Sequence, residues 1–149
     1  MYKKILVPVD DSKASLKALK EACALAKQCG SSLHAIHVVD LAQFSWSGTG
    51  YLQSSEVHEA SKEVGSKILQ RAIEVIESYG VAHEMEVLEN AGEKVASIIA
   101  KSVKRNECDL VVMGTHGFSG VMHLLMGSVA EGVLRQVDVP VMLIRKADD

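Results

Sequence analysis

The stretch Ile5-Leu6-Val7-Pro8-Val9-Asp10-Asp11-Ser12 decides how the chain starts to fold. Its apolar, β-branched run predicts a strand over 5–9, and the two aspartates and the serine predict the turn that ends it. Apolar residues then recur at spacings of three and four, which predicts a helix over 12–28 with a buried stripe of Leu16, Leu19, Cys23 and Ala26. Asp11 or Ser12 would cap this helix, and Gly30 would end it. The segment therefore reads as a strand followed by an amphipathic helix.

Strands and helices keep alternating along the rest of the chain. Apolar runs predict four further strands, over 33–39, 81–88, 110–113 and 141–144. Helical spacing predicts three further helices: one closed by Gly80 with its stripe at Val57, Val64, Ile68, Ala72 and Ile76, one over 92–104, and one that begins at Gly127-Ser128. Helical crossovers between consecutive strands are right-handed and place helices on both faces of a sheet. We therefore expect an α/β fold with an open, mostly parallel five-stranded sheet.

Length, composition and charge limit the classes of protein to which this chain can belong. With 149 residues, 48% of them hydrophobic and 23% charged, residues 1–149 are expected to form one globular domain. A net charge of −3 argues against a nucleic-acid partner. No apolar run is long enough to cross a bilayer, and Met1-Tyr2-Lys3-Lys4 leads straight into the first strand, so we expect neither a membrane anchor nor a signal peptide. The odd set of Cys23, Cys29 and Cys108 indicates reduced thiols and a cytoplasmic location.

Two common phosphate-binding motifs are missing from the sequence. No G-x-x-x-x-G-K-[ST] occurs, and the turn Asp10-Asp11-Ser12-Lys13 has no glycine, so a P-loop and a Rossmann dinucleotide fingerprint are excluded. Glycines gather instead after the fourth strand, in Gly114-Thr115-His116-Gly117-Phe118-Ser119-Gly120 and again in Gly127-Ser128. Glycine allows positive φ and the close approach of a ligand, and a helix N-terminus offers free N–H groups to an anion. This loop is therefore a candidate phosphate site.

Two interpretations of the glycine-rich loop stay open. In one, phosphates lie between two sets of backbone N–H groups, the first at Gly114 and Gly117, the second at Gly127, Ser128 and Val129. In the other, Ser128 and Glu131 form a capping box and Gly127 is a turn residue. Because residues 114–134 contain no Lys or Arg, backbone N–H groups, the helix dipole or a divalent cation would have to offset the phosphate charge.

Histidines are the candidate reactive groups, and none of them is assigned a role. The loop offers no obvious base or arginine finger, so we expect slow or negligible hydrolysis and assign no catalytic residue. His116 and His123 could reach phosphates, assist a water molecule or bind a metal, but a polar loop residue is the favoured interpretation of each. His34 and His37, three apart on a strand, point to opposite faces and cannot share one ion. No metal ligand is assigned.

The glycine pattern Gly114-x2-Gly117-x9-Gly127-Ser128 looks like the nucleotide-binding signature of the universal stress protein family, in its ATP-binding branch. The resemblance covers nearly the whole chain. It includes Lys4-Ile5-Leu6-Val7-Pro8-Val9-Asp10, His37-Val38-Val39-Asp40, Asp109-Leu110-Val111-Val112-Met113-Gly114 and Val139-Pro140-Val141-Met142-Leu143-Ile144. It implies one universal stress protein domain over 1–149 with the adenine nucleotide alpha hydrolase-like fold and strand order 3-2-1-4-5.

The resemblance also implies a binding site for ATP, with or without Mg²⁺ or Mn²⁺. Ribose and phosphates would be bound by Gly114, Gly117, Gly127, Ser128 and Val129. Pro8, Val9 and Asp10 would lie beside the adenosine, Val38 would contact adenine through its backbone, and Met113 would line the base or ribose pocket. Without the family's guidance, Asp10 would be read as a helix-capping residue, and Val38 and Met113 as plain core.

The last strand, over 140–144, has no charged residue before Arg145. An apolar edge strand invites aggregation unless it is paired, so we expect a homodimer through this strand, as family members commonly form. The segment 41–55, with Phe44, Trp46 and Tyr51, is interpreted either as a lid or partner surface or as disordered.

We expect a nucleotide-dependent stress-response switch or sensor that acts on an unknown regulatory protein. The alternatives are a slow ATPase or phosphoryl-transfer enzyme and a nucleotide-independent dimeric interaction protein.

Overall fold

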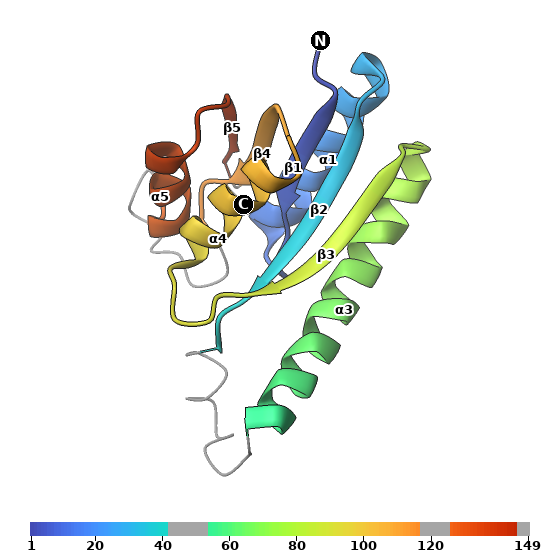
Figure 1. Ribbon diagram of the computed structural model, residues 1–149. Helices are drawn as coiled ribbons and strands as arrows, with labels where there is room; N and C mark the ends of the chain where they lie inside the picture. Colours follow the sequence, from blue (N-terminus) through green and yellow to red (C-terminus); the bar gives the residue numbers. More distant parts are fainter. Residues whose placement is uncertain (42–53, 117–125, 146–149) are drawn as a thin grey trace.

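A computed structural model describes residues 1–41, 54–116 and 126–145. Its strands and helices alternate in the order β1 (Lys4–Pro8), α1 (Lys13–Cys29), β2 (Ser32–Val39), α3 (Ser54–Tyr79), β3 (His83–Glu89), α4 (Val95–Arg105), β4 (Leu110–Gly114), α5 (Ser128–Gln136) and β5 (Val141–Ile144). The five strands form one parallel sheet in the order β3-β2-β1-β4-β5 (Figure 1). The predicted fold class and strand order are confirmed.

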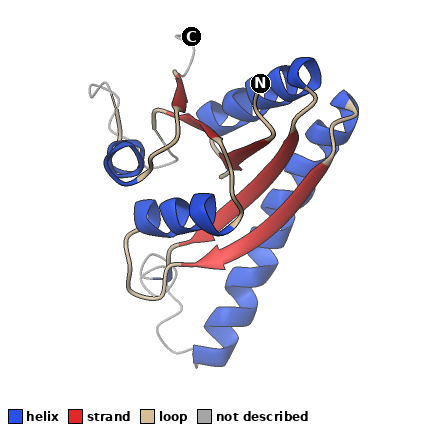
Figure 2. Cartoon of the chain, turned by 45° about the horizontal axis from the view of Figure 1, so that its top comes forward, coloured by secondary structure: helices blue, strands red, loops and turns tan. Residues whose placement is uncertain are grey.

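Helices cover both faces of the sheet (Figures 1 and 2). Because neighbouring residues of a strand point to opposite faces, Ile5 and Val7 enter one core while Leu6 enters the other. The first core is closed by α1 and α3, and the second by α4 and α5. Among the described helices, none combines the length and the apolar character that crossing a bilayer requires.

The buried face of α1 differs from the predicted stripe. Ser12 caps this helix by accepting a hydrogen bond from the Ser15 N–H, and Gly30 ends it with a φ of 70°. The side chain of Leu16 is 44% exposed, so its prediction as a core residue is wrong. The other three residues of the predicted stripe are buried, and the small residues Ala14, Ala18 and Ala22 join them, because the weak hydrophobicity of alanine hides part of the stripe in the sequence. In α3, Val64 is 43% exposed, so its place in the predicted stripe is also wrong; it lies beyond the edge of the buried face.

The start of α4 needs correction, whereas α5 begins at Gly127-Ser128 as predicted. The helix expected from residue 92 begins at Val95, because Ala91 and Gly92 have φ values of 46° and 85°, which a right-handed helix cannot include. In α5 the N-cap is Gly127, with no side-chain cap, and Ser128 is already the first helical residue. The capping box, one of the two interpretations that the sequence allows for this loop, is therefore excluded, and the Glu131 side chain accepts a hydrogen bond from Arg135.

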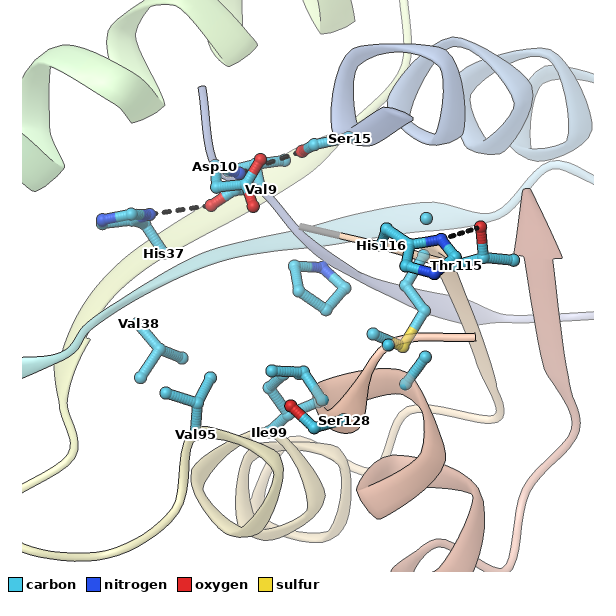
Figure 3. A pocket seen from close by; sticks show the side chains of 16 residues that line it. Val9, Asp10, Ser15, His37, Val38, Val95, Ile99, Thr115, His116 and Ser128 are labelled. Atoms are coloured by element: carbon cyan, nitrogen blue, oxygen red, sulfur yellow. Dashed lines mark hydrogen bonds between the residues drawn. The ribbon is translucent and has the colours of Figure 1, made fainter. Parts of the chain in front are cut away.

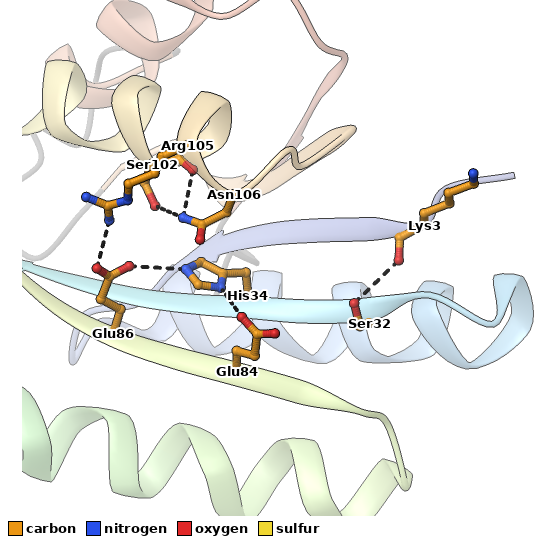
Figure 4. Close-up of polar contacts among 8 residues, drawn as sticks. All are labelled: Lys3, Ser32, His34, Glu84, Glu86, Ser102, Arg105 and Asn106. Atoms are coloured by element: carbon orange, nitrogen blue, oxygen red, sulfur yellow. Dashed lines mark hydrogen bonds and ion pairs between the residues drawn. The ribbon is translucent and has the colours of Figure 1, made fainter.

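The two histidines of β2 lie on opposite faces of the sheet, as predicted. His34 is buried on the side of α4, with Nε2 3.3 Å from Glu86 and Nδ1 3.5 Å from Glu84, and Arg105 also donates to Glu86 (Figure 4). The ring of His37 lies on the other face, against Gly65 in α3. Among the described residues, no group of three His, Cys, Asp or Glu side chains is placed to hold a metal ion.

Candidate functional site

A cavity of about 280 Å³ lies at the carboxyl ends of β1, β2 and β4. This edge is where open α/β sheets bind ligands, and the volume is near the lower end of the usual range of roughly 300–1,000 Å³. Nine of the ten predicted site residues line the cavity: Pro8, Val9, Asp10, Val38, Met113, Gly114, Gly127, Ser128 and Val129. The tenth, Gly117, lies outside the described residues, as do His123 and the aromatic residues of 42–53.

The cavity wall includes residues that the sequence reasoning missed: Ser15, His37, Val95, Ile99, Thr115 and Ala130. Three of them had a usable signal, because Ser15, Val95 and Ala130 each lie in the first turn of a helix that leaves the carboxyl edge of the sheet. His116, which the sequence left as a polar loop residue, also lines the wall.

The N-terminal ends of α1, α4 and α5 converge on this cavity through Ser15, Val95 and Ser128. At each such end the first N–H groups lack an intrahelical partner and carry the positive end of the helix dipole. Neither Lys94 at α4 nor Gly127 at α5 supplies a side-chain cap. No described residue of the cavity wall is a lysine or an arginine. The arrangement suits an anion that is bound by backbone N–H groups.

One wall of the cavity is apolar. Val38 lies at the carboxyl end of β2, Val95 begins α4 and Ile99 lies one turn further along α4; the three side chains meet on one side of the cavity (Figure 3). The buried side chain of Met113 continues this wall from β4. A flat apolar group such as a nucleobase is the kind of ligand that such a wall can accommodate.

Asp10 takes part in the turn after β1 and also faces the cavity. Its Oδ1 accepts a hydrogen bond of 2.8 Å from the Ser12 N–H, and Ser12 in turn caps α1. Asp10 therefore does not cap α1 itself; it holds Ser12, the residue that does. Oδ2 has no hydrogen-bond partner among the described residues, which leaves it as an acceptor at the cavity wall.

Gly114 and Gly127, the two predicted site glycines that the structure describes, allow close packing and do not have positive φ. Of the two properties of glycine that the sequence suggests for this loop, positive φ is not used at Gly114 or Gly127. A Cβ on Gly114 would lie 3.0 Å from the Ala14 Cβ, and a Cβ on Gly127 would lie 3.2 Å from the Thr115 carbonyl oxygen. Glycine thus lets α1 pack against the end of β4 and lets α5 start beside the strand.

His116 is the one histidine of the glycine-rich loop that the structure describes. Its Nδ1 lies 3.2 Å from the Thr115 hydroxyl oxygen (Figure 3). Its Nε2 is buried and has no hydrogen-bond partner in the described parts of the chain. The imidazole therefore makes a hydrogen bond at Nδ1, while its buried Nε2 has no hydrogen-bond partner among the described residues.

The sheet order and the cavity at its carboxyl edge define an α/β protein of the adenine nucleotide alpha hydrolase-like fold. The chain matches the model of the Universal stress protein family over residues 1–145, and it belongs to that family. It is 37% identical over 147 residues to Universal stress protein MJ0531 of Methanocaldococcus jannaschii, which covers 98% of this chain and 84% of that protein. It is 32% identical over 151 residues to Universal stress protein YxiE of Bacillus subtilis, covering 97% and 100% of the two chains.

Solved structures with similar folds include hypothetical protein MJ0577, with a TM-score of 0.84, 23% identity and coverage of 100% of this chain and 99% of that one. The universal stress protein of Archaeoglobus fulgidus in complex with dAMP has a TM-score of 0.68 at 23% identity, covering 96% and 98%. A universal stress protein in complex with cAMP has a TM-score of 0.67 at 21% identity, covering 96% of each chain.

Proposed function

We propose that this protein binds an adenine nucleotide, ATP in the first place, in the cavity at the carboxyl edge, and that it acts as a nucleotide-dependent stress-response switch or sensor. The observation that carries the proposal is the convergence of three helix N-termini on a cavity with one apolar wall. Two other proteins of this fold are in complex with adenine nucleotides, dAMP and cAMP, which supports the choice of ligand.

The proposal assigns each part of the cavity to a part of the ligand. Val38 and Met113 contact the base, with Pro8 and Val9 beside the adenosine, and the Asp10 carboxylate accepts from ribose hydroxyls. The backbone N–H groups of Gly114, Gly117, Gly127, Ser128 and Val129 hold ribose and phosphates. A divalent cation such as Mg²⁺ or Mn²⁺ accompanies the triphosphate, because no described cation in the wall offsets its charge.

Calorimetry with ATP, ADP and AMP tests this function. We expect binding by the unaltered chain and its loss in Gly127→Val, whose Cβ alone would lie 3.2 Å from the Thr115 carbonyl oxygen. The melting temperature of that variant without ligand shows whether it still folds. Added nucleotide should raise the melting temperature of any variant that binds it, because the ligand binds only the folded state. Full affinity in Gly127→Val, or no binding by the unaltered chain, would contradict the proposal.

We expect little or no hydrolysis of the bound nucleotide, because phosphoryl transfer depends on positioned charged groups and the described wall has no lysine or arginine. A slow ATPase is the second candidate function, and the open Nε2 of His116 is the observation that favours it. Phosphate release above background that disappears in the His116→Ala, His123→Ala double variant would select the ATPase over the switch.

We further propose a homodimer through β5, in the cytoplasm. β5 is an edge strand that pairs only with β4 among the described strands, and Met142 on it is exposed. Pairing with a second copy would cover this apolar edge. Sedimentation that shows only monomer at micromolar concentration would contradict the dimer without touching the nucleotide site.

A further inference from the structure

The peptide group between Val9 and Asp10 is held from both of its ends. The Val9 carbonyl oxygen lies 2.7 Å from the Nδ1 of His37, and the Asp10 N–H donates to the Ser15 hydroxyl at 2.9 Å (Figure 3). The Val9 N–H also donates to the Ile36 carbonyl oxygen at 2.7 Å. The end of β1 therefore has a fixed orientation where it reaches the cavity.

The two side chains that hold this peptide come from different elements. His37 belongs to β2, and its ring fits beside α3 because residue 65 is glycine: a Cβ there would lie 3.2 Å from the His37 Cδ2 and 2.8 Å from the Val87 Cγ1. Ser15 belongs to the first turn of α1 and is only 6% exposed. A carbonyl oxygen can only accept, so His37 must carry its proton on Nδ1 in this contact.

The orientation of this peptide sets the direction of the Asp10 carboxylate. Asp10 Oδ1 is engaged by the Ser12 N–H, so the position of the second oxygen follows from the backbone that His37 and Ser15 hold. An acceptor that is already oriented loses less freedom when a ligand binds.

We propose that His37 and Ser15 are positioning residues of the nucleotide site, which aim the Asp10 carboxylate at the ribose hydroxyls. This inference rests on the proposed function. It adds two side chains that determine selectivity for the sugar, one through the carbonyl and one through the N–H of the same peptide group.

Two substitutions at His37 each introduce a side-chain amide, but they place its N–H donor at different positions. His37→Asn keeps an N–H donor near the position of Nδ1, whereas His37→Gln carries its amide one carbon further out. We expect ATP affinity within about twofold of the unaltered chain for His37→Asn and about tenfold weaker for His37→Gln, the usual effect of one lost hydrogen bond. Ser15→Thr and Ser15→Ala form the same kind of pair for the hydroxyl. The ligand-free melting temperature of each variant identifies any that fails to fold.

The sugar supplies a readout that a purely structural role would not give. With 2′,3′-dideoxy-ATP, which offers Asp10 no hydroxyl, the loss in His37→Gln should disappear. In the ligand-free chain, nitrogen-15 NMR should find the proton of His37 on Nδ1. Equal ATP affinity for His37→Asn and His37→Gln, an equal loss with the dideoxy ligand, or a proton on Nε2 would overturn the inference alone. An unaltered chain that binds no adenine nucleotide would overturn the proposed function and this inference together.

Discussion

The N–H of Gly127 donates a hydrogen bond of 2.7 Å to the carbonyl oxygen of Thr115. The Thr115 N–H in turn donates to the Ile144 carbonyl oxygen at 3.0 Å, which ties the same residue to β5. Residues 115 and 127, on the two sides of the glycine-rich loop, are thus held together at the end of β4. Because Gly127 is also the N-cap of α5, this contact fixes the start of that helix, and the N–H groups of its first turn, against the sheet.

A proline at position 128 tests whether the backbone of α5 binds the phosphates. Proline is favoured at the first helical position, and Gly127 has φ −76° and ψ 168°, a conformation allowed before proline. Ser128→Pro should therefore keep the fold while it removes one N–H donor. We expect ATP affinity to fall about tenfold by calorimetry.

Ser128→Ala is the matched control for that proline variant, because it removes the hydroxyl and keeps the N–H. Its ATP affinity should stay within about twofold of the unaltered chain. If the alanine variant loses as much affinity as the proline variant, the hydroxyl, not the backbone N–H, carries the contact.

Two substitutions at Asp10 distinguish its structural role in the turn after β1 from its proposed role in binding the nucleotide. Asp10→Asn keeps an oxygen for the Ser12 N–H, whereas Asp10→Ala removes this hydrogen bond and should cost about 1 kcal/mol of the free energy of unfolding. In urea unfolding we expect only the alanine variant to be less stable. In calorimetry we expect both variants to bind ATP more weakly than the unaltered chain. An Asp10→Asn variant with undiminished ATP affinity would exclude the carboxylate from the site.

Gly132 and Ala96 set how closely α5 packs on α4. A Cβ on Gly132 would lie 2.6 Å from the Ala96 Cβ, closer than two carbon atoms can approach. Gly132→Ala should therefore lower the free energy of unfolding by about 1–3 kcal/mol through overpacking, in spite of the better helix propensity of alanine. The double variant Gly132→Ala, Ala96→Gly should recover most of that loss in urea unfolding. Gln136→Ala, exposed in the same helix, is the control, and a similar loss there would refute the packing argument.

Because two cysteines are buried, the free energy of unfolding should depend on pH in the alkaline range. Burial raises the pKa of the Cys23 thiol from 9.0 to about 11, and burial is also the main cause that raises the pKa of Cys108 to about 11. Between pH 9 and 11 the unfolded chain ionises these thiols while the folded chain keeps them protonated, so the free energy of unfolding should fall as pH rises through this range. Urea unfolding at a series of pH values measures the decline. A flat profile would contradict the raised pKa values.

The same burial predicts the order in which the thiols react. Cys29, at the end of α1, is partly exposed, whereas Cys23 and Cys108 are buried. With Ellman's reagent at pH 8 we expect one fast thiol, and the other two only after unfolding in urea. Loss of the fast phase in Cys29→Ser would identify it, and three equally fast thiols in the native protein would contradict the burial.

Local patterns in the sequence were sufficient for the elements and their order. The apolar runs at Ile5 and Leu110, and the helical spacing between them, depend only on residues a few positions apart, so their period can be read directly. Parallel strands with helical crossovers bring the ends of β1, β2 and β4 to one edge of the sheet. The topology therefore predicts where the site lies, whereas the assignment of Asp10 and Val38 to its wall came from the resemblance to the universal stress protein family.

Contacts between elements were decided by the tertiary structure alone. Nothing near Gly132 in the sequence indicates Ala96, and nothing near Gly65 indicates His37 or Val87. The need for glycine at positions 114 and 127 also depends on the atoms that approach them from Ala14 and Thr115. The type of a residue limits the backbone conformations that it can adopt. The neighbour that fills the space beside it is determined only when helices pack against the sheet and against each other. The alternating fold and the edge that carries the site thus follow from local sequence patterns, whereas the packing between layers fixes how His37, Ser15 and Asp10 meet there.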